Sequence, residues 1–271
     1  MKFINPTLNC ECKELNKKKY LEYNEPPPGE INLGLDLKKY KRLFYQCFFC
    51  KHLFAHHLKF KNKNLYREKY VQATYGSYEG IKKNFLKIRS INKKKSDNNK
   101  RCDRLEKFIN FKKNYKILDV GSGLGIFPYE FYKRGYRITC NDPDKNCVKF
   151  ISEELKLNII SKNFLNFRNK KEYNLITFNK VLEHLENPKK FIMKARSILK
   201  KHGFIYLEVP DIDAIKDKIG KNREEFLMGH YHVFSKKSLR TLINACKIKI
   251  LKLESIRDPS GKYTIFSFCQ I

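Results

Sequence analysis

After Tyr115, short runs of apolar residues alternate with longer segments whose apolar residues recur every three to four positions. Short apolar runs are typical of buried strands, and the periodic segments are typical of helices. The predicted strands are 116–120, 136–141, 158–161, 173–179 and 203–209. The predicted helices are 126–134, 145–157 and 188–200. This alternation predicts βαβ units and a parallel α/β sheet that helices cover on both faces.

The end of the chain adds one more helix and two more strands to this pattern. Ser235 stands before a helical pattern, and its hydroxyl can accept a hydrogen bond from the first turn, so we expect it to be the N-cap. Two strand-like runs follow, at 247–255 and 263–269.

The first 115 residues have a different pattern. Residues 1–60 show little regular periodicity, and three consecutive prolines within 25–29 predict a rigid turn. The pattern becomes more helical over 65–91, the polar stretch 93–100 predicts an exposed loop or linker, and a helix is expected over 101–111. We therefore divide the chain into a small cysteine-containing module (1–62), a helical linker region (63–115) and an α/β domain (116–271).

Composition and charge set limits on the function. The hydrophobic fraction of 41% is sufficient for a core, and there is no run of 18 apolar residues that could span a membrane. The N-terminus carries no apolar stretch typical of a secretory signal, so we expect a cytoplasmic location. The net charge of +30 is spread along the chain and carried mostly by lysine. It indicates either a generic solvated surface or the steering of an anionic partner, such as a phosphorylated small molecule or nucleic acid.

The predicted strand at 116–120 leads directly into a turn with glycines at positions 121, 123 and 125. Because glycine has no Cβ, such a turn can be tight and can approach a ligand closely. The turn lies at the carboxyl edge of the predicted sheet, where open α/β folds bind their ligands. A glycine-rich turn alone does not distinguish a dinucleotide from another adenosyl cofactor.

Two acidic residues narrow that choice. Asp119 stands two positions before Gly121, and Asp142 ends the next predicted strand, about 20 residues further along. A carboxylate there can accept hydrogen bonds from both hydroxyls of a ribose. Alternatively, Asp142 only caps the helix after Pro143. An NAD site also stays open as an alternative, although Gly-x-Gly-x-Gly lacks the longer dinucleotide spacing.

This combination resembles the class I, seven-strand Rossmann-like methyltransferases, from roughly Asp103 to the end of the chain. The resemblance implies a doubly wound, mostly parallel sheet with an antiparallel last strand, and S-adenosylmethionine as the cofactor. It implies a role in binding this cofactor for Asp119, Gly121, Ser122, Gly123, Gly125 and Asp142.

Three further segments resemble the same family. Asn163-Phe164 stands where the family has an Asp and an apolar residue that read the adenine; Asn departs from that pattern but can accept from the adenine amine through its carbonyl. Asn179, Glu183 and His184 belong to a segment that resembles the lining of the methionine end. The alternative for Glu183-His184 is favourable electrostatics at a helix start. Residues 203–210 resemble the fifth strand and its following proline.

Four cysteines fall in two close pairs, Cys10/Cys12 and Cys47/Cys50. Two such pairs can complete a closed tetrahedral zinc site, and they resemble the zinc-binding module ahead of some bacterial sugar methyltransferases. The first pair departs by having one intervening residue, so a histidine among His52, His56 and His57 could substitute. The alternative is a degenerate module without metal. With no export signal, we expect reduced thiols.

The segment 228–235 follows an irregular stretch and is expected above the carboxyl edge of the sheet. Its form, His-x-His-x-Phe-Ser, resembles a segment of methyltransferases that act on sugars and small metabolites. Methylation of a hydroxyl requires removal of a proton, and His232 is our first candidate for the general base. His230 and Tyr231 are second choices. The alternative is that His232 only bonds a loop and holds the helix start.

The leading hypothesis is therefore a methyltransferase that O-methylates a sugar, a nucleotide sugar or another phosphorylated small metabolite. An RNA methyltransferase is the alternative that the charge suggests. Against it, Asn179-Lys180-Val181-Leu182 replaces the Asn-Pro-Pro-Tyr type of motif used for base amines, and no RNA-binding module is recognisable. A non-catalytic S-adenosylmethionine-binding protein is a third possibility.

Overall fold

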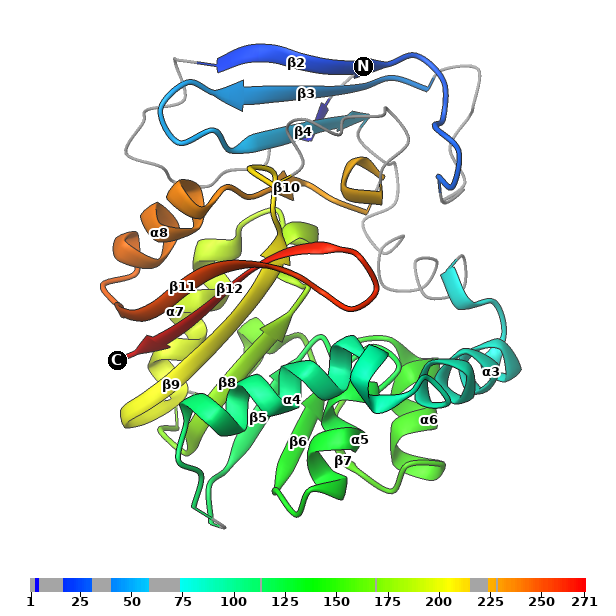
Figure 1. The fold of residues 1–271 in the computed structure, drawn as a ribbon, viewed down its shortest axis with the longest axis vertical. Coiled ribbons are helices and arrows are strands. Elements are labelled where there is room, and N and C mark those ends of the chain that lie inside the picture. Colours follow the sequence, from blue (N-terminus) through cyan, green and yellow to red (C-terminus); the bar gives the residue numbers. More distant parts are fainter. Residues whose placement is uncertain are drawn as a thin grey trace.

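The computed structural model describes residues 3–4, 17–30, 40–58, 74–112, 114–168, 170–214, 224–227 and 229–271. The larger of its two sheets has seven strands in the order β11-β12-β9-β8-β5-β6-β7 (Figure 1). These strands are β5 (Ile117–Val120), β6 (Ile138–Asn141), β7 (Asn158–Ile160), β8 (Tyr173–Asn179), β9 (Leu199–Pro210), β11 (Lys249–Arg257) and β12 (Tyr263–Gln270). Each predicted strand after Tyr115 is present.

The pairing within this sheet is mostly parallel. β5 pairs in parallel with β6 and β8, β6 with β7, and β8 with β9. β12 is antiparallel to both of its neighbours, β9 and β11. The predicted parallel sheet with an antiparallel last strand is confirmed, and the carboxyl ends of β5, β6 and β8 lie together at one edge.

Helices cover both faces of the large sheet (Figure 1). α4 (Asp97–Phe108) and α5 (Ile126–Lys133) share one apolar cluster with the sheet, and α7 (Pro188–Ile198) and α8 (Lys236–Ala245) share another. α3 (Tyr78–Arg89) packs against α6 (Lys145–Glu153). No described helix has the length and apolar character that crossing a membrane requires.

The start of α4 corrects the predicted linker. Residues 93–95 form a short 3-10 helix, and α4 begins at Asp97 rather than at Arg101. The hydroxyl of Ser96 accepts from the Asn99 N–H, and Asp97 adds an acidic residue to the first turn. Both features stabilise a helix start, so this polar stretch is not an open loop. At α8, Ser235 is the N-cap as predicted, in a reciprocal capping box with Ser238.

A second, antiparallel sheet lies beside the first (Figure 1). Its strands are β1 (Phe3–Ile4), β2 (Lys17–Tyr23), β3 (Arg42–Cys47), β4 (Leu53–Leu58) and β10 (His232–Val233). The sequence did not predict this sheet. The buried positions of β3 include Arg42 and Gln46 as well as Phe44, so burial does not follow hydrophobicity there.

The second sheet is completed by a strand from the far end of the chain. β10 pairs with β4 so that His232 faces Phe54 and Val233 faces Leu53. Phe44 and Leu53 also share an apolar cluster with Ile212, Phe226 and Val233. The N-terminal sheet is thus not built from residues 1–62 alone, because it includes residues 232–233. The division of the chain at residues 62 and 115 stays a prediction.

Candidate functional site

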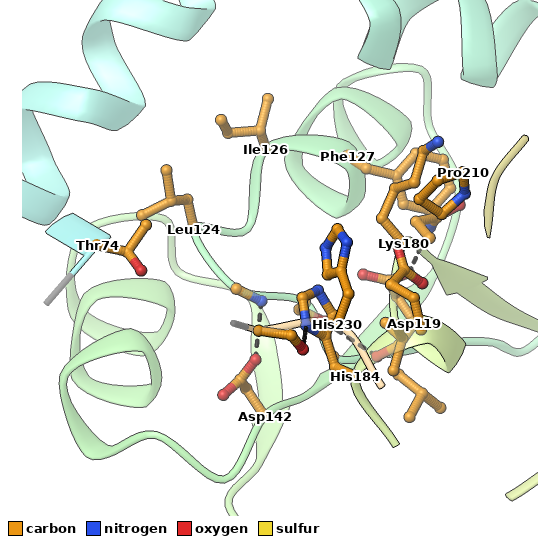
Figure 2. A pocket seen from close by; sticks show the side chains of 18 of the residues that line it. Thr74, Asp119, Leu124, Ile126, Phe127, Asp142, Lys180, His184, Pro210 and His230 are labelled. Carbon is orange, nitrogen blue, oxygen red and sulfur yellow. Dashed lines mark hydrogen bonds between the residues drawn. The ribbon is translucent and has the colours of Figure 1, made fainter. Parts of the chain in front are cut away.

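A cavity of about 1020 Å³ opens at the carboxyl ends of β5, β6 and β8 (Figure 2). Its walls come from the glycine turn, the segment after β8, Gly29 and Glu30 of the N-terminal region, and Glu225, Leu227, Gly229 and His230. The predicted site residues that line it are Asp119, Gly121, Ser122, Gly123, Asp142, Asn163, Phe164, Asn179, Glu183, His184 and His230. Residues far apart in the sequence thus meet around one space.

The glycine turn needs its glycines for two different reasons. Gly121, Gly123 and Gly125 all have left-handed backbones, with φ of 72°, 52° and 73°. A Cβ on Gly121 would lie 2.6 Å from Cγ2 of Val181, and one on Gly125 would lie 2.9 Å from the side chain of Ile151. A Cβ on Gly123 would meet no atom within 4 Å, since this glycine faces the cavity. Gly125 is the N-cap of α5 and packs behind the turn.

Asp119 is held rigidly at the cavity wall. Its Oδ1 accepts from Thr177 Oγ1 at 2.6 Å and from Asn179 Nδ2 at 2.8 Å. Burial raises the pKa of this carboxyl to about 6, while these hydrogen bonds oppose the rise. Asp119 is therefore mainly ionised at neutral pH and suits the recognition of a cationic ligand.

Asp142 lies across the turn from Asp119. Its Oδ2 accepts from the Gly123 N–H at 2.8 Å, and its Oδ1 accepts from the Asp144 N–H at 2.9 Å. Burial raises the pKa of Asp142 to about 6. The cap of α6 is Asp144, whose side chain accepts from the first-turn N–H groups of Asn146 and Cys147. The helix-capping alternative for Asp142 is thus wrong.

The predicted adenine-reading pair lies at the same cavity. Asn163 caps the short 3-10 helix Phe164–Asn166, and its Oδ1 accepts from the Leu165 N–H at 3.0 Å. That carbonyl is the atom we expected to accept from an adenine amine, and it is already engaged in part. Phe164 is buried and presents an apolar wall. Ser122 lines the cavity but donates its hydroxyl to the Asp119 carbonyl, so it also holds the turn.

Two histidines from different segments, His184 and His230, also line the cavity and lie close together (Figure 2). The rings of His184 and His230 are 4.7 Å apart between centroids. Nδ1 of His184 lies 2.6 Å from the Gly229 carbonyl, and Nδ1 of His230 lies 3.1 Å from the Glu225 carbonyl. A carbonyl only accepts, so each Nδ1 carries the hydrogen and each Nε2 keeps its lone pair.

Both imidazoles are neutral at pH 7. Burial lowers the pKa of His184 to about 4, and burial together with neighbouring positive charges holds the pKa of His230 well below its usual value. Ligand atoms of Glu183, His184 and His230 lie within 4.8 Å of one another. Within the described ranges, these are the His, Cys, Asp and Glu side chains close enough to share a metal ion.

The structure places His232 and Tyr231 away from the cavity. His232 is fully buried in β10, where its Nδ1 lies 2.9 Å from Nε2 of His52. His52 in turn meets the Ser238 hydroxyl through Nδ1 at 3.2 Å. Tyr231 is buried as well. His232 therefore joins the N-terminal sheet to the start of α8, as the alternative interpretation proposed, and the geometry favours His230 as the proton acceptor.

The described part of the chain tests the zinc hypothesis only in part. Cys47 and Cys50 are both buried at the β3–β4 turn. Cys10 and Cys12 lie outside the described residues. Both ring nitrogens of His52 already have polar neighbours, so it does not suit the role of substitute ligand. Zinc stays a prediction, which the zinc-to-protein ratio of chelator-free protein can test.

Sequence reasoning missed several residues of the site. Lys180 and Arg101 line the cavity, and Thr177 donates a hydrogen bond to the Asp119 carboxylate. Arg42 lies in the second sheet but donates to the His230 carbonyl at 3.1 Å, also donates to the Leu227 carbonyl, and pairs with Glu30 at 3.3 Å. An unusual Lys after the fourth predicted strand was a visible signal for Lys180. Nothing in the sequence indicated that Arg42 reaches residue 230.

Comparison with known proteins agrees with this geometry. A scan against protein families matches residues 93–250, more than half of the chain, to a methyltransferase domain. Ubiquinone biosynthesis O-methyltransferases of Rickettsia typhi and Rickettsia bellii are 26% and 23% identical over 119 and 132 residues. These matches cover 42% and 47% of this chain, and they span 45% and 51% of those relatives.

Solved structures share the fold. The 1,6-didemethyltoxoflavin-N1-methyltransferase of Burkholderia thailandensis, bound to 1,6-didemethyltoxoflavin and S-adenosylhomocysteine, has a TM-score of 0.53 at 12% identity, covering 82% of this chain and 96% of its own. Coclaurine N-methyltransferase has a TM-score of 0.52 at 11% identity, covering 64% and 70%. Together with the family match, this similarity shows that the chain belongs to the methyltransferase-domain family and has the Rossmann-like class I fold.

Proposed function

We propose that this protein is an S-adenosylmethionine-dependent methyltransferase that methylates an oxygen of a small, anionic metabolite, with a sugar, a nucleotide sugar or another phosphorylated compound as the leading class. The observation that carries the proposal is a single cavity lined by the two acids Asp119 and Asp142 and by the His184–His230 pair. This arrangement offers a place for a cationic cofactor and, beside it, a place for a hydroxyl that must lose its proton.

The chemistry requires little from the protein beyond position and one proton acceptor. The acceptor hydroxyl gives its proton to Nε2 of His230, and the oxygen attacks the methyl carbon of the sulfonium. The new C–O bond forms while the C–S bond breaks, and the electron pair of that bond stays on sulfur. The products are the methyl ether and S-adenosylhomocysteine, and His230 later releases the proton to water. Asp119 and Asp142 hold the cofactor in line for this attack.

The names of the relatives support oxygen as the nucleophile. The Rickettsia relatives carry the name ubiquinone biosynthesis O-methyltransferase, although the matches span about half of their length. Because of this name, the assay should include the acceptor class of these relatives together with sugars and nucleotide sugars. The N-methyltransferases among the solved structures share the fold alone at 12% identity or less.

The decisive experiment has two stages. Calorimetric titration with S-adenosylmethionine tests the cofactor site, and absence of binding by the folded protein would overturn the proposal. A pool of small metabolites, with phenolic, sugar and phosphorylated arms, is then incubated with cofactor carrying a deuterated methyl group. Mass spectrometry of the products identifies the acceptor, and fragmentation shows whether the label is on oxygen. Label found on nitrogen or carbon alone would contradict the O-methylation.

The net charge of +30 keeps an RNA substrate as the second candidate. An RNA methyltransferase of this charge should bind bulk RNA with an affinity that falls steeply as salt rises, and it should label RNA with the deuterated methyl group. We expect any RNA binding to be weak and to leave the RNA unlabelled. Label in RNA but in none of the small-molecule arms would favour this candidate instead.

A further inference from the structure

Lys180 has a backbone conformation that a lysine adopts at a cost. It follows the last residue of β8 and has a left-handed φ of 58°. Residues other than glycine occupy this region rarely, and such strain persists only where the surrounding structure imposes it. The Lys180 N–H donates to the Glu208 carbonyl at 3.0 Å and so holds the residue against β9. The strained backbone therefore lies in the wall of the cavity.

The side chain of Lys180 lies in the cavity, on the same side as Pro210 (Figure 2). Its Nζ donates to Oγ1 of Thr264 at 2.6 Å, and Thr264 donates its own hydroxyl hydrogen to Asp258. An ammonium group has three N–H donors, and Thr264 accepts from one of them. Within the described ranges, the structure gives this Nζ no ion pair at 4.0 Å or less. Thr264 therefore fixes the direction of the ammonium without neutralising it.

Two of the three acidic groups whose charges act on Lys180, Glu208 and Asp258, face arginines. Glu208 is fully buried and accepts from Arg101 at 2.7 Å, and it also pairs with Arg104. Asp258 faces Arg104 at 3.7 Å. Burial lowers the pKa of Lys180, whereas the charges of Glu183, Glu208 and Asp258 raise it. Glu208 and Asp258 already face arginines, whereas the charge of Glu183 acts on Lys180 from the same cavity wall. Lys180 therefore keeps N–H donors for a ligand in the cavity beside Glu183.

From these contacts we propose that Lys180 is an acceptor-binding residue whose ammonium donates hydrogen bonds to an anionic oxygen, carboxylate or phosphate, of the methyl acceptor. This inference rests on the proposed function, because it names Lys180 as the residue that binds the anionic group of the proposed acceptor. Lys180 and the His184–His230 pair line the same cavity, so an acceptor held by its anion could present a hydroxyl to His230. A fixed ammonium would also select against neutral analogues, which would leave its charge without a partner.

The test titrates the whole 271-residue chain by calorimetry, both alone and with saturating S-adenosylhomocysteine, with two named probes, inorganic phosphate and benzoate. Benzyl alcohol is the neutral control for benzoate. The variants are Lys180→Met and Lys180→Asn, which remove the charge, and Lys180→Arg, which keeps it. Asn tolerates a left-handed backbone, so it separates loss of charge from backbone strain. The matched control is Lys156→Met, because Lys156 is also left-handed, with φ of 55°, but lies exposed outside the cavity.

We expect the wild-type protein to bind at least one anionic probe more tightly than benzyl alcohol. The Met and Asn variants should weaken that binding about tenfold or more, Arg should restore part of it, and Lys156→Met should leave it unchanged. Binding of phosphate alone would indicate a phosphorylated acceptor, and binding of benzoate alone a carboxylate. Binding of neither anion, or equal weakening by Lys156→Met, overturns the inference.

Cofactor titration of the same variants separates this inference from the proposed function. S-adenosylmethionine should bind the Lys180 variants as it binds the wild type, which also shows that they are folded. If the wild type binds the anionic probes but not the cofactor, the proposed function fails while the role of Lys180 in anion binding stands. If the cofactor binds and neither anion does, the reverse holds.

Discussion

At the scale of single residues, the proposed cofactor site contains two carboxyl groups whose ionised form burial disfavours. Asp119 and Asp142 are both almost fully buried, and burial raises the pKa of each to about 6. Hydrogen bonds from Thr177, Asn179 and the Gly123 N–H lower that cost but do not remove it. A cationic ligand in the cavity would stabilise the ionised form, so cofactor binding and ionisation are linked.

This linkage predicts a pH-dependent cofactor affinity. Each carboxyl is ionised above pH 6 and takes up a proton below it, so affinity for S-adenosylmethionine should fall as the pH drops from 7 to 5. Asp142→Asn should weaken binding about tenfold at pH 7 and keep only the pH dependence due to Asp119. Calorimetric titrations at pH 5, 6 and 7 measure both effects. Equal wild-type affinity at all three values would contradict the prediction.

The ligand-free protein should respond to pH in the opposite direction at this site. The folded-state pKa of Asp142 is raised above its ordinary value of 3.8, so the folded state holds a proton there more tightly than the unfolded chain does. The contribution of this group to stability therefore falls as pH rises from about 4 to about 6. Asp142→Asn removes the contribution. Relative to wild type, the variant should gain melting temperature between pH 4 and pH 7; a constant difference would argue against the shift.

Substitutions of the two histidines in the His-x-His segment should have different effects, one on turnover and the other on stability. His230→Ala should lower turnover about a hundredfold or more, because the proton acceptor is lost, with cofactor binding retained. His232→Phe should leave the activity of the folded protein near the wild-type value but cost about 1–3 kcal/mol of stability, because His52 loses a buried partner. Single-turnover assays and denaturant unfolding measure the two effects. A reversed pattern would restore His232 as the base.

At the scale of elements, the glycine turn is tied to the segment after β8 by close packing. A Cβ on Gly121 would lie 2.6 Å from Val181, so Ala there must push that segment outward. Val181 lies between Lys180 and the short 3-10 helix Leu182–His184. The turn that faces the cofactor and the segment that carries His184 are thus positioned by the same contact.

Gly121→Ala should consequently displace both the glycine turn and the segment that carries His184. We expect cofactor affinity and turnover each to fall about tenfold or more. The control is Gly135→Ala, since Gly135 has a left-handed φ of 91° but a Cβ added to it would meet no atom within 4 Å. That control carries the backbone cost, about 1–2 kcal/mol, without the contact. Calorimetry and steady-state kinetics on both variants decide, and equal behaviour would assign the effect to backbone strain alone.

At the scale of the whole molecule, the N-terminal sheet supports the wall of the cavity that carries His230. Arg42 is almost fully buried in β3 and ties the segment 227–230 to that sheet through two backbone carbonyls. β10 extends the same sheet, and Gly29 and Glu30 line the cavity. The position of His230 in the cavity wall therefore depends on residues almost two hundred positions earlier in the chain.

Arg42→Lys should keep a positive charge beside Glu30 but lose the forked contact with the carbonyls of Leu227 and His230. We expect cofactor affinity to stay within about twofold of wild type and turnover to fall about tenfold, because the proton acceptor is displaced. Lys41→Met, at the neighbouring exposed position, is the control and should change neither quantity. Loss of cofactor affinity in Arg42→Lys would show instead that the N-terminal sheet supports the whole fold.

The local sequence determined the α/β part of this protein and the glycine turn with its acidic residues. Helices and strands there follow from hydrophobic periodicity, and the turn at 121–125 with Asp142 follows from residues within about 20 positions of one another. Ser235 capped α8 as predicted, for reasons confined to one turn of helix. Such features are local, so the chain specifies them without reference to distant contacts.

Only the tertiary structure decided how the residues around His230 and Lys180 are arranged. Between two neighbouring histidines of one motif, it placed His230 in the cavity and His232 in a buried contact with His52, because β10 begins at His232 and pairs that residue with the N-terminal sheet. It brought Arg42 to residue 230 and Lys180 to Thr264, pairings that no local pattern encodes. The second sheet was hidden because its buried face includes Arg42 and Gln46, whose burial depends on partners supplied from elsewhere in the chain.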